Sequence, residues 1–438
     1  MFQNQKDGNG KRNGKGIILG YDLGHQFAQI SYCGSDEIQP EPETVSAVTG
    51  TEQYNIPMVL CKRAGVGQWY YGREAVKFAK EEEGILVEDL LMLAQRGEDV
   101  IVEGEAFDPV ALLTLFVKRS LSLLNIRLSL YQIDALMFTV DELTPRMVDV
   151  LSRVAGGLQL KTKNICFQNH LESFYAYTLH QDSELRKNDV VIFEYDTGLR
   201  MLRLECNQRT SPKVVLIGQE EFPDILRRVW SENAEERERQ KQELDLLFSH
   251  TVQEALDGGV VSTVFLLGDG FKEGWAKESL KVLCRNRRVF QGNNLYSKGS
   301  CYAMVERLNP SEEWKKYVYL GADKLKSNIG MKALRRGEDS YYAILDAGTN
   351  WYEAASDFDI ILESGNTVDF LITPLTGSGV LERSVHLPGI PDRPRGATRL
   401  NIHIEMTDVN QASVTIEDLG FGELFPSSGK AWSSTIQV

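Results

Sequence analysis

The chain has 438 residues, of which 42% are hydrophobic and 25% charged, as is usual for a folded protein of two or three domains. Its formal charge of −14 disfavours nucleic acid or a membrane surface as the main partner, because an acidic surface repels phosphate backbones and anionic lipids. The six cysteines are scattered without a C-x-x-C pair, a pattern typical of neither a metal site nor a secreted disulfide framework.

The first 15 residues are polar and predict a flexible leader. They lack the apolar stretch of a signal peptide, and no later apolar run is long enough to span a bilayer. The cysteines are typical of small buried side chains in a reducing compartment. Together these features predict a cytoplasmic protein.

The first folded segment has the pattern of a β-hairpin. An apolar run at 17–19 leads into Tyr21-Asp22-Leu23-Gly24, and a second extended run follows at 27–32. Beyond it, hydrophobic periodicity predicts further strands within 54–72 and at 133–140, and helices at 74–83, 109–124 and 144–157.

The hairpin pattern recurs later in the chain. An apolar strand predicted at 190–195 runs into Tyr195-Asp196-Thr197-Gly198, and another extended run follows at 201–206. The unit of strand, Tyr-Asp-x-Gly and strand therefore occurs twice, which indicates two similar lobes that face each other. Coincidence is the alternative, because glycine after aspartate is common in turns.

The second half of the chain changes character. Residues 230–253 predict a charged, solvent-exposed helix, and an apolar strand at 264–267 enters Gly268-Asp269-Gly270 before a helix that begins near Lys272. After a linker at 309–316, short alternating segments are separated by Gly, Pro, Asp and Asn. That pattern is typical of an all-β sandwich.

In this order, the two hairpins, the Gly-Asp-Gly segment and the β pattern resemble the DnaK-type heat-shock chaperones of the actin-like ATPase superfamily. The most specific likeness is at 387–396, where Leu-Pro-Gly-Ile-Pro-Asp-Arg-Pro-Arg-Gly is similar to the family's G-I-P-x-x-P-R-G loop. More diffuse likenesses lie at 56–59, 71–75, 138–140, 155–156, 171–177, 294–303 and 400–416.

The resemblance implies an α/β two-lobed actin-like ATPase fold followed by an all-β sandwich domain. We expect the leader at 1–15, a nucleotide-binding-type domain with a reduced second-lobe insertion at 16–308, the linker at 309–316, and the sandwich at 317–438. The helical lid of the chaperones is not expected, since the sequence ends where the family's sandwich ends.

The resemblance also implies a site for ATP or ADP with Mg²⁺. In the family, an aspartate of each turn positions the metal-bound water shell, and glycines let the backbone approach phosphate and adenosine. The residues that match are Asp22, Gly24, Asp196, Gly198, Gly268 and Gly270. The family's water-orienting glutamate aligns with Asn169 or, one gap away, with Glu172.

The chain departs from the family at both phosphate turns. His25 and Gln26 replace the hydroxyl residues of the first turn, and Leu199 and Arg200 stand where the second turn has glycine. These replacements remove hydroxyl groups and add Cβ atoms where phosphate would approach most closely. Only the Arg200 side chain offers a charge in return.

Two further parts of the nucleotide site are reduced. The family's phosphate-contacting lysine has no clear match, and residues 90–96 are the nearest equivalent. The stretch between Asp196 and Leu267 is too short for the whole subdomain that supplies much of the adenine pocket. We therefore expect weak nucleotide binding or none, and ATP turnover no higher than background.

In the chaperones, the sandwich holds an extended peptide by backbone hydrogen bonds and one apolar pocket. By alignment Met331, Ala333 and Phe358 would lie nearest that groove, although Met331 and Phe358 are as well explained as core residues. The motifs from 389 to 416 indicate that the sandwich retains the binding function, so we expect 317–438 to bind an extended apolar segment. The alternative is that these motifs fix the strand connections and dock the sandwich against the lobes. The histidines at 25, 170 and 180 show no metal-ligand spacing.

Three functional hypotheses follow. The leading one is a chaperone-like protein that binds a protein or peptide client and carries a degenerate ATP-binding domain. The second is a working ATPase that uses replacement residues such as Arg200. The third is a scaffold whose actin-like lobes self-assemble.

Overall fold

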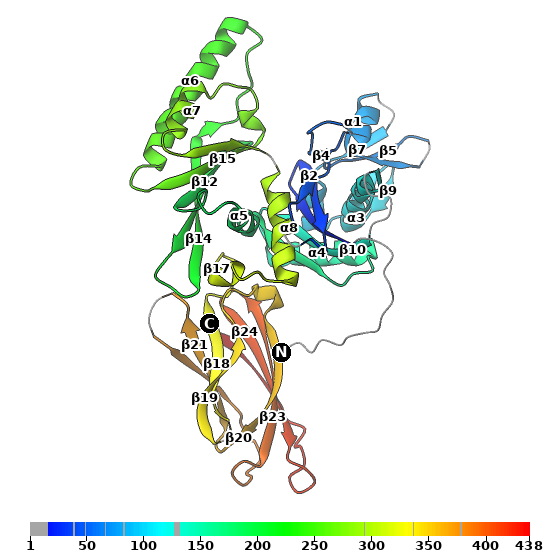
Figure 1. The fold of residues 1–438 in the computed structure, drawn as a ribbon. Helices are drawn as coiled ribbons and strands as arrows, with labels where there is room; N and C mark the ends of the chain where they lie inside the picture. Colours follow the sequence, from blue (N-terminus) through cyan, green and yellow to red (C-terminus); the bar gives the residue numbers. More distant parts are fainter. Residues whose placement is uncertain are drawn as a thin grey trace. The chain divides into compact units, whose positions relative to one another are not determined.

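The computed structural model describes residues 16–37, 40–48, 50–65, 67–81, 84–126, 132–292, 294–335, 337–376 and 379–438. The chain is a mixed α/β protein and divides into two compact units, Met1–Tyr317 and Val318–Val438 (Figure 1). The predicted leader and the end of the predicted 74–83 helix lie outside the described residues. No helix in the described ranges is long and apolar enough to cross a lipid bilayer.

The first unit contains a sheet in the order β11-β10-β1-β2-β3. Strand β1 pairs in parallel with β10 and antiparallel with β2, and β10 pairs in parallel with β11. The strands are β1 (Gly16–Leu23), β2 (Phe27–Gly34), β3 (Glu43–Thr44), β10 (Gln132–Val140) and β11 (Ile165–Asn169).

A second sheet of this unit runs β16-β15-β12-β13-β14. Strand β12 pairs in parallel with β15 and antiparallel with β13, and β15 pairs in parallel with β16. The strands are β12 (Asp189–Tyr195), β13 (Gly198–Asn207), β14 (Lys213–Leu226), β15 (Val261–Leu267) and β16 (Arg288–Gln291). Both predicted hairpins are therefore confirmed as hairpins, and they hold equivalent places in two sheets with the same pairing pattern.

Local capping explains where the helices of this unit begin. The Asp108 side chain accepts a hydrogen bond from Val110 N, with Pro109 in the first turn of its helix, and Thr144 similarly accepts from Met147 N. The helices are α1 (Gly72–Lys80), α2 (Leu90–Arg96), α3 (Pro109–Ser120), α4 (Pro145–Leu158), α5 (His170–Leu179), α6 (Ala234–Ala255), α7 (Lys277–Leu283) and α8 (Leu295–Leu308).

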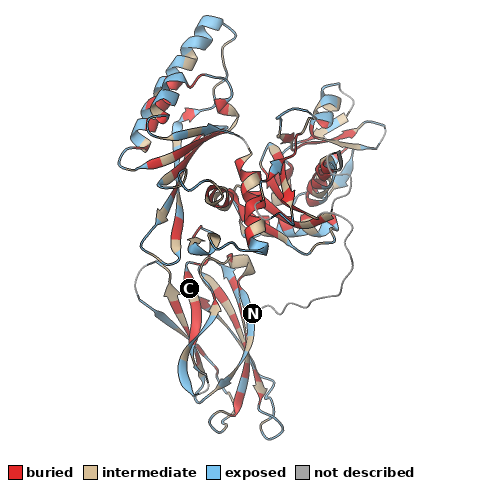
Figure 2. Ribbon diagram, in the orientation of Figure 1, coloured by how far each residue is buried: buried red, intermediate tan, exposed pale blue. Residues whose placement is uncertain are grey.

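Helix α8 packs closely on both α5 and β1, because one glycine of α8 and one of β1 leave no side chain at the points of contact. A Cβ at Gly20 of β1 would lie 2.2 Å from Ser297 O, and one at Gly299 of α8 would lie 2.0 Å from Ser173 O of α5. This close packing brings the beginning of α8 next to the beginning of α5. Figure 2 marks α8 and the adjoining sheet as largely buried.

The helix expected near Lys272 begins five residues later, at Lys277. The intervening Trp275 is buried, and its indole N–H donates to Gly270 O at 2.7 Å. The Asp245 carboxylate of α6 then accepts from the backbone N–H groups of Lys277, Glu278 and Ser279 at 2.7–2.9 Å. A carboxylate from another helix therefore fixes the start of α7.

The second unit contains two antiparallel four-stranded sheets, in the orders β19-β18-β21-β22 and β20-β23-β24-β25. Side chains of both sheets, such as Phe370 and Ile402, belong to one buried cluster. The strands are β18 (Ser327–Arg335), β19 (Glu338–Leu345), β20 (Ala355–Leu362), β21 (Thr367–Pro374), β22 (Leu381–His386), β23 (Thr398–Asp408), β24 (Gln411–Gly420) and β25 (Ala431–Gln437). Assignment of either unit to an actin-like or chaperone fold stays a prediction.

Candidate functional site

Asp22, one of the two predicted metal-positioning aspartates, is buried at the end of β1. Its carboxylate Oδ1 lies 2.8 Å from Nε2 of His170, the first residue of α5. His170 is held there because the preceding Asn169 caps α5. The carboxylate expected to face a metal-bound water shell is thus already engaged by a side chain of the protein.

Arg200 of β13 joins the two sheets of the first unit. Its Nη2 donates to Asp141 Oδ1 at 2.7 Å, and its Nε donates to Glu194 Oε2 at 2.5 Å. Asp141 follows β10 in the first sheet, whereas Glu194 lies opposite Arg200 on β12 in the second. Asp141 Oδ1 also lies 3.6 Å from His170 Nδ1, which connects Arg200 to Asp22 through the imidazole.

Tyr296, at the start of α8, completes the arrangement. Its ring stacks on the imidazole of His170 with centroids 4.1 Å apart and planes 3° from parallel. Its hydroxyl donates to Glu194 Oε2 at 3.4 Å. We call this set the cross-sheet network; its members are Asp22, Asp141, His170, Glu194, Arg200 and Tyr296.

The network keeps its histidine charged. Burial disfavours the imidazolium, but the negative charges of Asp22 and Asp141, together with the hydrogen bond to Asp22, outweigh it and raise the pKa of His170 to about 9. The close approach of the charged His170, followed by the hydrogen bond from Arg200, holds the pKa of Asp141 well below its usual range despite burial.

Burial acts differently on the second carboxylate of Arg200. It raises the pKa of Glu194, while the neighbouring Arg200 pulls that pKa back down. Burial also opposes the charge of Arg200, but its carboxylate partners raise the guanidinium pKa overall. Arg200 therefore remains a cation whose nearest anions are the protein's own carboxylates.

The second turn differs from the first. Asp196 is exposed, and its Oδ1 accepts from the backbone N–H of Asp269 at 3.0 Å. Leu199 is buried in the core of this half of the unit, so its side chain points away from the network that Arg200 joins. Gly198 is only loosely surrounded, because a Cβ there would lie 3.6 Å from Leu226.

The other predicted glycines are needed for close packing. Gly268 has φ +95°, and a Cβ on it would lie 2.5 Å from Tyr195 O. A Cβ on Gly270 would lie 2.3 Å from Tyr195 Cδ1, and one on Gly24 would lie 2.8 Å from Phe27 O. Packing alone therefore accounts for these three glycines, and contact with a nucleotide stays a prediction.

The two candidates for the water-orienting role occupy one helix start. Asn169 Oδ1 accepts from the backbone N–H of Glu172 at 2.8 Å, which makes Asn169 the N-cap of α5. Glu172 lies half-buried in the first turn of the same helix. Capping therefore accounts for Asn169 without a catalytic role.

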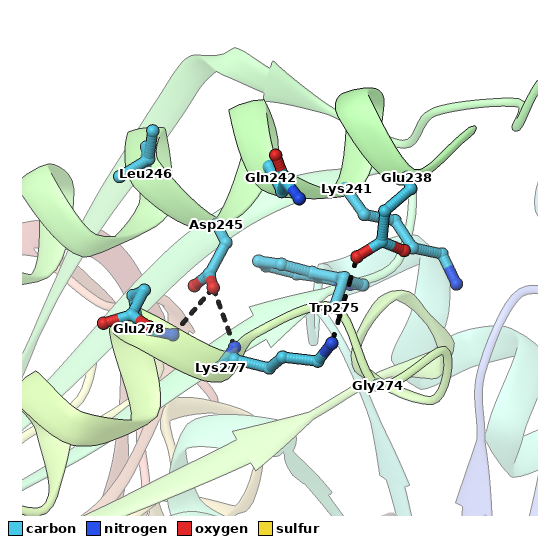
Figure 3. A pocket seen from close by; sticks show the side chains of 9 residues that line it. All are labelled: Glu238, Lys241, Gln242, Asp245, Leu246, Gly274, Trp275, Lys277 and Glu278. Carbon is cyan, nitrogen blue, oxygen red and sulfur yellow. Dashed lines mark hydrogen bonds and ion pairs between the residues drawn. The ribbon is translucent and has the colours of Figure 1, made fainter. Parts of the chain in front are cut away.

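A hollow of about 400 Å³ lies elsewhere in the first unit, between α6 and residues 274–278 (Figure 3). The charged groups that line it have partners within the protein: Asp245 caps α7, Lys277 Nζ lies 3.9 Å from Glu238, and Lys241 Nζ donates to Glu273 O. None of the network residues lines it. The described ranges also contain no group of three or more His, Cys, Asp or Glu residues placed to hold a metal ion.

The three predicted peptide-contacting residues of the second unit differ in burial. Met331 is 4% exposed and belongs to the core that the two sheets share. Ala333, two residues along β18, is half-buried. Phe358 of β20 is also half-buried, and its ring centroid lies 5.3 Å from that of Tyr342 on β19.

The two sides of this core are bridged by different contacts. On the side of β22 and β25, Val385 and Ile436 are buried, Trp432 and Val438 are partly buried, and Arg383 Nε donates to Gln437 O at 3.2 Å. On the side of β19 and β20, Tyr342 is 43% exposed. Four further apolar side chains on that side are only partly buried: Ile344, Phe358, Ile360 and Leu362.

The 387–396 loop is fixed by an ion pair inside the second unit. Both terminal nitrogens of Arg393 lie 2.7 Å from the Asp418 carboxylate, and the two side chains are 4% and 0% exposed. The hydrogen bonds from Arg393 drive the pKa of Asp418 well below its usual range, although burial of the carboxylate opposes this. Trp432 Nε1 also donates to Pro388 O at 3.1 Å. These contacts favour the interpretation that the loop fixes strand connections.

Sequence reasoning missed four members of the network: Asp141, His170, Glu194 and Tyr296. A signal was available for Glu194, since it is a carboxylate within the apolar strand 190–195 and requires a partner there. The hairpin register then places Arg200 opposite it. No comparable signal links Asp141, His170 and Tyr296, which come from distant parts of the chain.

Comparison with known families places the molecule but assigns no activity. The model of the C-terminal part of a family of unknown function, DUF5716, matches residues 41–322. A domain of unknown function, DUF8552, matches residues 324–438. No curated protein matches the sequence.

Proposed function

Because the chain belongs to the DUF5716 C-terminal family, whose function is unknown, its activity must be inferred from its own sites; we propose that it is a chaperone-like peptide-binding protein whose first unit is a degenerate ATPase. The side of the second unit's core at β19 and β20, called its open side because Tyr342 is 43% exposed there, carries this proposal. The cross-sheet network supports the part that concerns nucleotide.

The network argues against productive phosphate binding. Its only cations are His170 and Arg200, and each is paired with carboxylates of the protein. A phosphate would have to displace Asp141 or Glu194 from Arg200 and would then be repelled by the displaced carboxylate. The arrangement therefore supports a first unit that keeps its sheets together without a nucleotide.

The open side supports binding of an extended segment. Strands β19 and β20 are sheet edges, and edge strands offer backbone groups to an added strand. Phe358 lies opposite Ile402, so it faces the shared core, yet it remains half-buried. An apolar side chain of a bound segment could cover Phe358 and its neighbour Tyr342.

The charges of these edges indicate what the segment would contain. Glu338 and Asp339 lie on β19, and Asp357 and Asp359 lie on β20. Asp357 and Asp359 alternate with the core-facing Phe358, so they lie on the outer face of the same edge. Acidic residues along an edge that also carries apolar side chains favour a ligand with an apolar centre and basic ends. The proposed ligand is thus an extended apolar peptide flanked by lysine or arginine.

Fluorescence anisotropy on the full chain tests the proposal. The probe is a labelled nine-residue peptide of alternating leucine and serine with a lysine at each end. We expect saturable micromolar binding that Phe358→Ala weakens about fivefold, since roughly 1 kcal/mol of apolar contact is lost. The matched control Ile361→Ala, on the opposite face of β20 and 57% exposed, should leave binding unchanged.

Two results would count against this function. One is the absence of binding by a protein whose melting curve shows that it is folded. The other is equal weakening by Phe358→Ala and Ile361→Ala. ATP with Mg²⁺ should leave the anisotropy curve unchanged; a shift of the curve by nucleotide would instead favour the working ATPase.

A further inference from the structure

The edge strand β25 differs from the other edges of the second unit by having no charged residue. Its sequence is Ala-Trp-Ser-Ser-Thr-Ile-Gln, whereas β19, β20 and β22 each carry two charged side chains. Charges on an edge strand discourage pairing with another chain. By this criterion β25 is the edge that is open to strand addition.

The outward-facing backbone of β25 can be assigned from its hydrogen bonds. Val438 N donates to Asn410 O, and Asp418 N donates to Lys430 O, so the even-numbered residues turn their backbone groups toward β24. The odd-numbered residues therefore face away from β24. Arg383 confirms this by donating to the outward-facing Gln437 O, which leaves Ser433 and Thr435, both exposed, at the middle of the edge.

We propose that β25 is a dimerisation edge, on which a second copy of this chain pairs antiparallel about a two-fold axis at Ser434. In this register, Ser433 of one copy lies opposite Thr435 of the other, and these two residues exchange backbone hydrogen bonds. The two sheets then join into one continuous eight-stranded sheet. The interface is isologous, as expected of a two-fold dimer.

The side chains of β25 are complementary to themselves in this register. On one face, Ser433 meets Thr435 of the second copy and extends the row of hydroxyls that Thr415 and Ser413 form on β24. On the other face, Trp432 meets Ile436. No charged residue lies opposite another, because residues 431–437 carry none.

This edge lies on the opposite side of the core from β19 and β20, so a dimer would leave the proposed peptide site accessible. Because one strand pair buries little area, we expect dissociation in the micromolar range. The proposed dimer is independent of the proposed peptide binding, so an experiment can contradict one of them without bearing on the other.

Cysteine cross-linking of the full chain tests the register. Ser434 faces its own copy across the axis in a non-hydrogen-bonded pair, where Cα atoms are about 4.5 Å apart, within disulfide range. In a background with Cys206→Ser and Cys284→Ser, we expect Ser434→Cys to give a disulfide-linked dimer on oxidation by oxidised glutathione. The control Ser356→Cys, half-buried on the opposite edge β20, should stay monomeric.

Sedimentation of the protein without introduced cysteines gives an independent readout. Ser433→Lys with Thr435→Lys places like charges opposite each other and should convert the dimer to monomer without lowering the melting temperature. The same lysines at Ser413 and Thr415, one strand inside the edge, should leave the dimer intact. A monomeric wild type at high micromolar concentration, or equal cross-linking through positions 356 and 434, would overturn the proposal.

Discussion

The two Tyr-Asp-x-Gly hairpins of the first unit share a topology but not a chemical environment. Each follows the same pattern of one parallel and one antiparallel neighbour in its sheet. Asp22 of the first is buried and bonded to His170, whereas Asp196 of the second is exposed and accepts a backbone N–H. The motif thus sets the backbone, while residues from distant segments decide what each aspartate can do.

The second hairpin contributes to the network through a different residue. Arg200, four positions after Asp196, reaches the carboxylates of both sheets. The network is therefore asymmetric: the first hairpin supplies only the anion Asp22, whereas the second supplies the cation Arg200 together with its partner Glu194. Four expected outcomes test this asymmetry.

Arg200→Met should produce the largest loss of stability. It leaves the buried Glu194 carboxylate without its cation, which we expect to reduce the free energy of unfolding by about 3 kcal/mol. Urea denaturation measures the change. The matched control Arg153→Met breaks an exposed ion pair with Asp108 and should lose less than about 1 kcal/mol. Equal losses in the two variants would contradict a structural role for the network.

The charge on His170 should make stability depend on pH. Its folded-state pKa of about 9 lies above the ordinary value of 6.5, so its stabilisation is complete below pH 6.5 and is lost as the pH rises to about 9. The expected loss over this window is about 3 kcal/mol. Denaturation curves between pH 6 and 9.5 measure it, and His170→Gln should flatten the dependence. A wild-type protein of constant stability across the window would contradict the assigned charge.

Replacing a tightly packed glycine of the first unit by alanine should cost more stability than replacing a glycine that has free space around it. Gly270→Ala places a methyl group 2.3 Å from the Tyr195 ring and should lose about 2 kcal/mol of stability. Gly24→Ala, which meets only Phe27 O at 2.8 Å, should lose less. The control Gly218→Ala meets no atom within 4 Å and should be near neutral. Thermal melting ranks the three variants, and a Gly218 variant as unstable as the Gly270 variant would refute the packing explanation.

The two aspartates should differ when each loses its charge. Asp22→Asn removes an anion from the buried His170 and should lower stability by about 1.5 kcal/mol. Asp196→Asn changes an exposed side chain and should alter stability by less than about 0.5 kcal/mol. The unfolding free energies of both variants in the same buffer provide the measurement. Similar values would mean that the hairpins are equivalent after all.

Much of the fold was predictable because it depends on local signals. The hairpins and most helices followed from apolar periodicity, and the caps Asp108 and Thr144 lie at the starts of two of those helices. The start of α7 was not predictable, since Asp245 reaches it from another helix. Apart from the pairing of Glu194 with Arg200, the network was also beyond sequence reasoning, because its other contacts join β1, α5, β13 and α8, which only the packing of the unit brings together.

The peptide site of the second unit stays a prediction. Of the residues expected near it, Phe358 lies partly buried on the open side, whereas Met331 is buried in the core. Residue type and spacing do not distinguish a side chain that closes a core from one that borders an opening. The relation of β19 to β20, which comes from the order of strands in two sheets, makes that distinction.

The central claim is that the first unit holds its two sheets together with its own charges instead of a bound nucleotide. Isothermal titration calorimetry of the full chain with ATP and Mg²⁺ tests it most directly. The network predicts no saturable heat, because the cations His170 and Arg200 are already paired with carboxylates. Saturable one-to-one binding that Asp196→Ala abolishes would contradict the claim.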